Sequence, residues 1–289
     1  MHNIISLAAH RGHAPEPQGL EVISSVPSNP TGPSIVFVHG AFAGAWCWAE
    51  HFLDHFAKLG YPSHALSLRG HGASAGQDGL AKHSLSDYVS DLAMVVRAMD
   101  GPVVLVGHSM GGFVVQKYLE RLGMGADPGV QIGGAVLMAS VPPQGLVPPT
   151  MWMAWTQPAL IQRLTMLLMG GPELANQFLV PDAVGQSLFA SDLSRERVES
   201  LMARFRGESQ RVVLDMTLLD PLWLWCVPRV PMLVLGAEHD AFVPPALVHM
   251  TGLTYGRPVE VVRGMGHAMM LEADWERAAE PIVGWLSGT

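Results

Sequence analysis

The sequence predicts an α/β fold in which helices cover both faces of a mostly parallel β-sheet, with one helical insertion. Short apolar runs such as 35–38 and 102–106 are typical of strands that are buried on both faces of a sheet. Segments with helical periodicity lie between these runs. One long stretch, 141–228, interrupts the alternation and contains no convincing buried strand. Because strands and helices alternate elsewhere, a parallel sheet with helices on both sides is favoured.

The individual elements follow from periodicity and from the turn residues at their ends. Strands are expected at residues 20–26, 35–38, 63–68, 102–106, 132–139, 230–235 and 258–262. The clearest helices are expected at 48–59, 85–99, 113–122 and 272–286, with another after Pro244. Ser84 and Asp87 resemble a capping box that would start the helix at Leu85. Residues before about Leu20 are expected to form a loose tail.

The interruption predicts two structural parts. Residues 1–140 and 229–289 are expected to form the α/β core, and residues 141–228 a helical cap inserted into it. The cap sequence is rich in Trp, Met, Gln and Pro, and its pattern predicts helices. We found no internal repeats or low-complexity tracts that would indicate a repeat architecture or a disordered linker.

Composition limits the partners of the chain. The 289 residues are 49% hydrophobic and 15% charged, which is typical of a packed globular protein. The formal net charge of −8 disfavours nucleic acid and anionic membranes, which attract basic surfaces. There is no apolar run of about 18 residues and no basic segment before the short apolar start, so we expect no membrane span and a cytoplasmic location. Cys47 and Cys226 are expected to be free thiols.

Motifs for nucleotides and metals are missing from the sequence. It contains neither G-x-x-x-x-G-K-[ST] nor an intact G-x-G-x-x-G, so nucleotide binding is disfavoured. It also lacks Cys-x-x-Cys and His-Glu-x-x-His, two common metal-binding patterns. We therefore expect a protein that works without a cofactor or a metal.

A nucleophile is predicted at Ser109. Gly107-His108-Ser109-Met110-Gly111 fits the pattern G-x-S-x-G and lies between an apolar strand and an amphipathic helix. A sharp strand-to-helix turn pushes its central residue outward, and the two glycines leave room for that turn. The N-terminal end of the following helix directs partial positive charge at the site, where negative charge develops. A Gly-rich turn with a helix-capping serine is the alternative interpretation.

A serine hydroxyl needs a base within hydrogen-bond reach, and the chain offers 13 histidines. His267 follows the last strand, at the sheet edge where catalytic groups gather in open α/β sheets. We predict that His267 is the general base and that Asp240, after the penultimate strand, orients it. This assignment gives the chain order Ser, Asp, His. Glu238 is the rival carboxylate.

The negative charge that develops on a carbonyl oxygen needs backbone donors. One donor is expected to be the N–H of Met110, directly after Ser109. The other is expected from the loop after the strand at 35–38, where Ala41 is favoured and Phe42 is the alternative. The competing interpretation is that His39-Gly40 only ends a strand.

Together these segments resemble the α/β-hydrolase family across almost the whole core. The matching segments are 39–46, 69–74, the turn around Ser109, 236–244 and 266–267. The first of them resembles the esterase and hydroxynitrile lyase branch. The resemblance implies a cap between the sixth and seventh core strands, where 141–228 lies. The chain departs from a frequent family pattern at Ser67, where many relatives carry Asp, and we expect this to affect the anchoring of the loop and not catalysis.

The expected function is hydrolysis of a carboxylic ester with a hydrophobic acyl group, through an acyl-serine intermediate. We expect Phe42, Trp152, Trp155 and Trp223 to bind this small hydrophobic substrate, with ordinary packing between cap and core as the alternative. Other enzymes would use the same triad on a thioester, a lactone, a carbon–carbon bond or a cyanohydrin. A catalytically silent, receptor-like binding protein is the alternative from another class. The oligomeric state is left open.

Overall fold

A single twisted sheet organises the chain. The computed structural model describes residues 3–4, 19–178, 187–190 and 193–288. Eight strands pair in the order β1-β2-β4-β3-β5-β6-β7-β8. Their bounds are β1 Asn3–Ile4, β2 Val22–Ser25, β3 Ser34–Val38, β4 Ser63–Leu66, β5 Val103–His108, β6 Ile132–Met138, β7 Met232–Ala237 and β8 Val259–Val262. β1 and β2 pair antiparallel, as do β2 and β4, and every other neighbouring pair is parallel.

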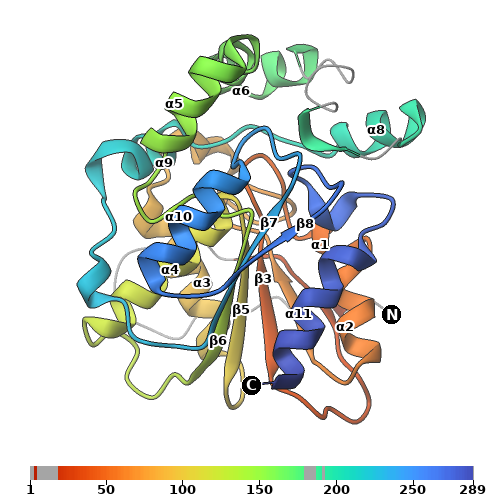
Figure 1. Ribbon diagram of the computed structural model, residues 1–289, viewed down its shortest axis with the longest axis vertical. Coiled ribbons are helices and arrows are strands. Elements are labelled where there is room, and N and C mark those ends of the chain that lie inside the picture. Colours follow the sequence, from red (N-terminus) through yellow and green to blue (C-terminus); the bar gives the residue numbers. More distant parts are fainter. Residues whose placement is uncertain (1–2, 5–18, 179–186, 191–192, 289) are drawn as a thin grey trace.

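Helices cover both faces of this sheet, as the sequence predicts (Figure 1). One face carries α1 (Trp46–Ala49), α2 (Phe52–Lys58) and α11 (Glu276–Gly288), and the other carries α3 (Leu85–Arg97), α4 (Met110–Gly123) and α10 (Pro245–Tyr255). Strand β3 shows why both faces are apolar. Ile35 and Phe37 pack into the first core, whereas Val36 and Val38 pack into the second, because successive side chains of a strand point to opposite faces.

The predicted capping box at the start of α3 is confirmed. The Ser84 side chain accepts a hydrogen bond from the N–H of Asp87, and the Asp87 carboxylate accepts one from the N–H of Ser84. These two bonds satisfy donors that have no acceptor within the helix. Short 3₁₀ turns at η1 (Gln77–Lys82) and η4 (Met269–Leu271) complete the loops at the carboxyl ends of the strands.

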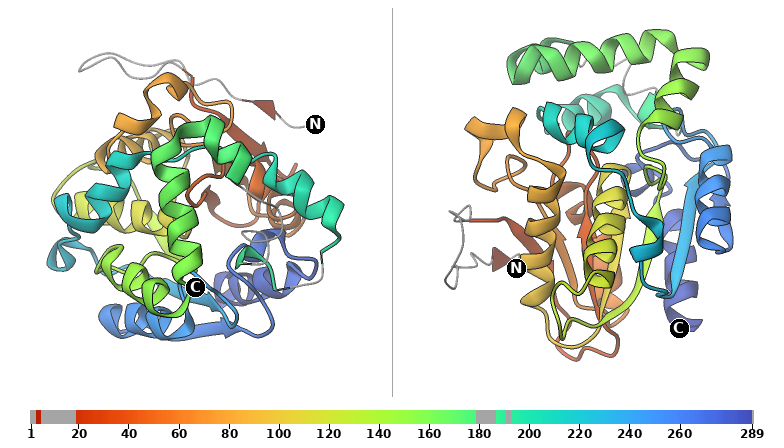
Figure 2. Two further views of the ribbon diagram at one scale, coloured as in Figure 1. Left: turned by 90° about the horizontal axis from the view of Figure 1, so that it is seen from above. Right: turned by 90° about the vertical axis from the view of Figure 1, so that its left-hand side faces the viewer.

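Residues 141–228, which we call the cap segment, connect β6 to β7 through helices. They are α5 (Val147–Thr156), α6 (Pro158–Phe178), α8 (Arg195–Met202), α9 (Gln210–Leu214), a π-helical turn η2 (Asp215–Leu219) and a 3₁₀ turn η3 (Leu224–Cys226). Figures 1 and 2 show α5 and α6 crossing over one end of the sheet. Among the described residues, no helix, α6 included, has the length and apolar character that a bilayer crossing demands.

The observed elements differ from the expected ones at both ends of the chain. Asn3–Ile4 adds a two-residue strand to the sheet edge where only a tail was expected, while residues 5–18 lie outside the described part. The last helix begins at Glu276 instead of 272. Glu272 has extended backbone and turns its carboxylate toward the N–H groups of Ala190 and Gly266, so it supports a loop and does not start the helix.

Candidate active site

Ser109 lies on a sharp turn between β5 and α4. Its φ of 53° and ψ of −119° are strained values for a residue with a side chain. Such backbone costs about 1–3 kcal/mol and persists only where its surroundings enforce it. The glycines on either side explain how the turn fits. A Cβ on Gly107 would lie 2.5 Å from the carbonyl oxygen of Gly111, and a Cβ on Gly111 would collide with the carbonyl oxygen of His39.

His267 and Asp240 form a buried hydrogen-bonded pair. The distance between His267 Nδ1 and Asp240 Oδ2 is 2.7 Å. The other carboxylate oxygen, Oδ1, accepts hydrogen bonds from the N–H groups of Phe242 and Val243, both at 2.8 Å. Because these backbone donors fix the carboxylate, Asp240 holds the imidazole with its proton on Nδ1. The Nε2 atom is then the nitrogen left to accept a proton.

Glu238, the rival carboxylate, lies elsewhere in the same loop. Its side chain is 45% exposed, and its Oε2 accepts a hydrogen bond from the N–H of Gly264. Its Oε2 also lies 3.8 Å from His239 Nε2. The structure therefore brings Asp240, and not Glu238, to His267.

Two further contacts hold the His267 loop against the turn that carries Ser109. His108 Nε2 donates to the carbonyl oxygen of His267 at 2.9 Å, and the two imidazole rings lie 4.7 Å apart. Within the His267 loop itself, Glu272 accepts the N–H of Gly266 at 2.8 Å. Ser109 and His267 both line one cavity, so the structure places these two sequence-predicted residues at a common site.

The two expected oxyanion donors also belong to this cavity. Ala41 and Met110 both line it. Met110 is the first residue of α4, so its N–H has no acceptor within the helix. The alternative donor, the N–H of Phe42, instead points to the carboxylate of Glu208 at 3.2 Å. Of the two residues weighed for the loop after β3, the geometry therefore favours Ala41.

Ser67 anchors the loop that carries these donors. Its hydroxyl donates to Glu21 Oε2 at 2.6 Å and accepts the N–H of Ala45 at 2.8 Å. The same Glu21 oxygen accepts the N–H of Ala73. A serine together with a carboxylate from the start of the chain thus stands where many relatives have a single aspartate. The departure at Ser67 concerns loop anchoring, as expected.

The cavity has a volume of about 370 Å³ and a mostly apolar lining. Such a volume is typical of small-molecule sites, which span about 300–1,000 Å³. Phe42 lines it, as predicted. The side chains that the cap segment contributes are mainly aliphatic: Val141, Leu146, Met153, Ile161, Leu164, Leu168, Leu188, Val213 and Met216. The cavity between the cap segment and the core therefore has a lining that suits an apolar group of a ligand.

The three tryptophans expected to bind substrate lie outside this lining. Trp152, Trp155 and Trp223 are 41%, 89% and 46% exposed. Helix geometry explains the difference, because α5 turns Met153 toward the cavity and its tryptophans toward the outer face. Sequence periodicity in a short, uniformly apolar helix could not tell these faces apart. The residues of α5 that line the cavity are Pro149, Thr150 and Met153, and neither of its tryptophans is among them.

Two histidines beside the site are neutral. Leu68 N–H donates to His39 Nε2, and His39 Nδ1 bonds the carbonyl oxygen of Gly40, which requires the neutral ring with its proton on Nδ1. Burial, aided by the charge of His71, lowers the pKa of His39 to about 3. Burial and the neighbouring His267 likewise hold the pKa of His108 well below its usual range.

These neutral histidines predict that acid destabilises the fold. Below about pH 6.5 histidines of the unfolded chain take up protons, whereas His39 and His108 stay neutral in the folded protein. The unfolded state then binds more protons, so stability falls as pH falls. From about pH 6.5 to about pH 5, His39 alone lowers the unfolding free energy by about 2 kcal/mol. Urea denaturation at both pH values measures this; an equal or higher value in acid contradicts it.

The chain is similar to known proteins in sequence and in fold. A family model described as "Alpha/beta hydrolase family" matches residues 35–280. A non-heme haloperoxidase of Rhodococcus erythropolis is 38% identical over 114 residues, which are 39% of this chain and 39% of the relative. Methyl jasmonate esterase 1 of Vitis vinifera is 37% identical over 89 residues, which are 30% of this chain and 33% of the relative. The alignments thus span no more than about two fifths of these relatives.

Solved structures share the architecture over most of its length. An esterase from Exiguobacterium antarcticum superposes with a TM-score of 0.68 at 18% identity, covering 93% of this chain and 96% of that one. A bromoperoxidase from Bacillus anthracis gives a TM-score of 0.68 at 19% identity, with the same coverage. At these identities the likeness shows the fold.

Proposed function

Because the chain belongs to the alpha/beta hydrolase family, we propose that it hydrolyses carboxylic esters with a hydrophobic acyl group, using Ser109, His267 and Asp240. One observation carries the proposal: His267, which is hydrogen-bonded to the buried Asp240, lines the same apolar cavity as Ser109 with its strained backbone. Such a pair supplies what a serine lacks, namely a base held in the right tautomer. Proteins named as an esterase and as a haloperoxidase are similar to parts of this chain, and the apolar cavity supports a hydrophobic acyl group.

In the proposed acylation step, Ser109 Oγ attacks the ester carbonyl carbon and its proton passes to His267 Nε2. The carbonyl oxygen gains negative charge and accepts hydrogen bonds from the N–H groups of Ala41 and Met110. His267 then gives the proton to the alcohol oxygen as the carbon–oxygen bond breaks. The products of this step are the free alcohol and an acyl-serine at Ser109.

In the proposed deacylation step, water takes the place of the alcohol. His267 removes a proton from water, whose oxygen attacks the acyl carbon, and the same backbone donors stabilise the second oxyanion. The proton returns to Ser109 Oγ as the acid leaves. Asp240 stays ionised throughout and stabilises the imidazolium that forms in each step. The reaction needs water as its only co-substrate.

The apolar lining predicts that medium-length acyl esters outperform acetate on the same leaving group. Each buried methylene is worth about 0.8 kcal/mol, so two added carbons raise kcat/KM by about tenfold until the cavity is full. We expect hexanoate to decanoate esters to be the best substrates. The measurement is kcat/KM against acyl length with a common leaving group.

Two variants on α5 test whether the preference for acyl length arises in the cavity. Met153→Trp fills space in the cavity, so we expect it to shift the optimum toward shorter acyl chains. Trp155→Ala changes an 89% exposed residue of the same helix and is the matched control, expected to leave the optimum in place. If acetate is preferred by all three proteins, the acyl group does not bind in this cavity. Turnover of thioesters, lactones or cyanohydrins but of no ester would replace the proposed reaction with one of these.

A further inference from the structure

The loop after β3 that carries Ala41 and Phe42, which we call the oxyanion loop, is hydrogen-bonded to the cap segment at Phe42. The N–H of Arg206 donates to the carbonyl oxygen of Phe42 at 2.8 Å, and the N–H of Phe42 donates to Glu208 Oε2 at 3.2 Å. Phe42 has a φ of 65°, in the left-handed region that a residue with a side chain avoids. Strain of about 1–3 kcal/mol must be offset by neighbouring contacts. Both backbone groups of Phe42 are held by residues that lie more than 160 positions along the chain.

Each oxygen of the Glu208 carboxylate accepts two hydrogen bonds. Its Oε1 accepts from the hydroxyl of Tyr88 at 2.8 Å and from the N–H of Ser209 at 2.7 Å. Its Oε2 accepts from the N–H of Phe42 and from His71 Nε2, both at 3.2 Å. The side chains of Glu208 and His71 are completely buried. A carboxylate is the group that suits this position, because both of its oxygens must accept.

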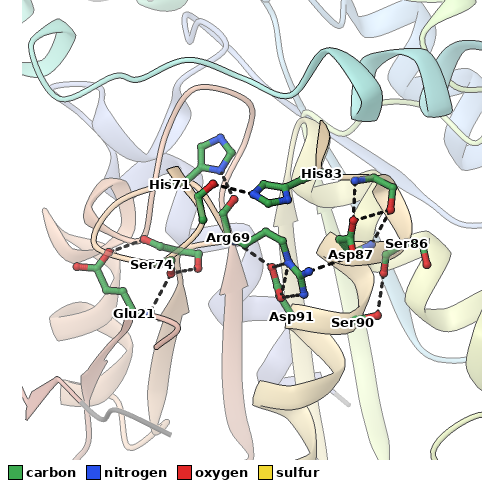
Figure 3. Close-up of polar contacts among 12 residues, drawn as sticks. Glu21, Arg69, His71, Ser74, His83, Ser86, Asp87, Ser90 and Asp91 are labelled. Carbon is green, nitrogen blue, oxygen red and sulfur yellow. Dashed lines mark hydrogen bonds and ion pairs between the residues drawn. The ribbon is translucent and has the colours of Figure 1, made fainter. Parts of the chain in front are cut away.

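The histidine that faces Glu208 is itself held in place by the core. Figure 3 shows the turn that carries His71 tied to α3 through Arg69. The guanidinium of Arg69 donates to Asp91 through both Nε and Nη2, and through Nη1 to Asp87 at 3.0 Å. His71 Nδ1 bonds the carbonyl oxygen of Arg69 at 3.2 Å. The ring therefore donates from a fixed position toward the cap segment.

Glu208 and His71 each favour the ionised form of the other. Burial opposes ionisation of His71, but the charge and hydrogen bond of Glu208 outweigh it and raise the pKa of His71. Burial would raise the pKa of Glu208, but His71 and the surrounding hydrogen bonds outweigh it and lower that pKa. Glu208 is thus an anion at neutral pH, and it favours the protonated form of His71. An ionised acceptor makes the stronger hydrogen bond to the N–H of Phe42.

We propose that Glu208 is a positioning residue that holds Phe42 in its left-handed backbone and so fixes the N–H of Ala41 toward the oxyanion. The inference rests on the proposed function, since it assigns Ala41 as a donor. Glu208 is also one of the residues that line the cavity, but its carboxylate is completely buried against Phe42 and His71, so we assign it a role through Phe42. Residues 206–208 belong to the cap segment, whereas Ala41 belongs to the core. Glu208 therefore links the position of the cap segment to the geometry of the oxyanion donors.

Glu208→Gln tests the assignment with almost no change in shape. An amide can accept at one end only, so its NH₂ must face either the N–H of Phe42 or the N–H of Ser209. We expect kcat to fall about 10- to 100-fold, less than the 10²- to 10³-fold effect of deleting an oxyanion donor, with KM nearly unchanged. The rate at which a fluorophosphonate labels Ser109 should fall in parallel, because that reaction also builds negative charge on an oxygen.

Glu50→Gln is the matched control. Glu50 also joins the core to the cap segment, through Arg197 and Arg204, but does not contact the oxyanion loop. We expect its kcat and labelling rate to equal those of the wild type. Where Glu208→Gln does not fold, Arg206→Pro removes the other bond to Phe42 and should give the same loss of kcat.

The outcomes separate this inference from the proposed function. A wild-type kcat in Glu208→Gln, or a raised KM with kcat unchanged, overturns the positioning role and leaves ester hydrolysis in place. A wild type that hydrolyses no ester overturns the proposed substrate. In that case the labelling rate still decides the role of Glu208, because phosphonylation of Ser109 requires no ester turnover. A labelling rate that is equal in wild type and Glu208→Gln overturns the inference.

Discussion

Asp240→Asn is expected to lower kcat by about 10⁴-fold while the fold stays intact, as the equivalent change does in a serine protease with this triad. The hydrogen bonds explain why an isosteric change is so costly. Oδ1 accepts two backbone N–H groups, so the oxygen of an asparagine must stay there and its NH₂ must face His267. The imidazole then carries its proton on Nε2, and that nitrogen cannot accept a proton from Ser109.

Glu238→Gln is the control for this variant, because it changes an exposed carboxylate of the same loop. We expect its kcat to match that of the wild type. The measurement is steady-state kcat on a hexanoate ester for the three proteins, with thermal denaturation to confirm folding. Near-normal turnover in Asp240→Asn together with a large loss in Glu238→Gln would reassign the acid to Glu238.

Ser109→Ala is expected to abolish labelling by a fluorophosphonate and to lower kcat by about 10⁶-fold, the scale seen when the nucleophile of a serine hydrolase is removed. The alanine retains a side chain, so the strained backbone at this position is unchanged. The loss therefore reports the missing hydroxyl and not a relaxed turn.

Ser90→Ala is the matched control, since Ser90 is an exposed helix residue whose hydroxyl bonds the backbone of Ser86. It should be labelled once per chain, like the wild type. The measurement is intact-protein mass after labelling, combined with kcat. One label that persists in Ser109→Ala would place the nucleophile elsewhere and remove the basis for the proposed mechanism.

The sheet could be predicted because its strands are buried on both faces. Runs such as 35–38 and 102–106 have no polar residues to place, and the helices between them have clear apolar stripes. Two features were not predicted, strand β1 and the start of the last helix, and each has a local reason. Asn3–Ile4 is too short to show a pattern, and it forms the edge of the sheet beside β2. Glu272 is a residue typical of a helix start, but its carboxylate instead accepts hydrogen bonds from the N–H groups of Ala190 and Gly266.

The core of the site could also be predicted, because the chemistry dictates residue types at fixed places along the chain. Ser109, Asp240 and His267 each follow a strand at the same edge of the sheet, so topology alone brings them together. The cap segment offers no such rule. Which face of α5 meets the cavity depends on how the segment packs, so Met153 lines it and Trp155 does not.

Glu208 could not be found from the sequence for a different reason. It lies 166 residues from Phe42 and 137 from His71, and no motif links these positions. Its role depends on Phe42, His71 and Tyr88 of the core, which meet its carboxylate only when the cap segment is folded against them. In the sequence Glu208 is one of many charged residues of the cap segment, and such residues are usually exposed.

The most direct test of the account is to look for the acyl-serine itself. The protein is mixed with a hexanoate ester that has a chromogenic leaving group, the reaction is quenched in acid within the first turnovers, and the peptides are analysed by mass spectrometry. The account predicts a burst of leaving group and one hexanoyl group, carried by Ser109 and reduced to background in Ser109→Ala. Turnover of the ester with no acyl group on Ser109 at any time, and no burst, would contradict it.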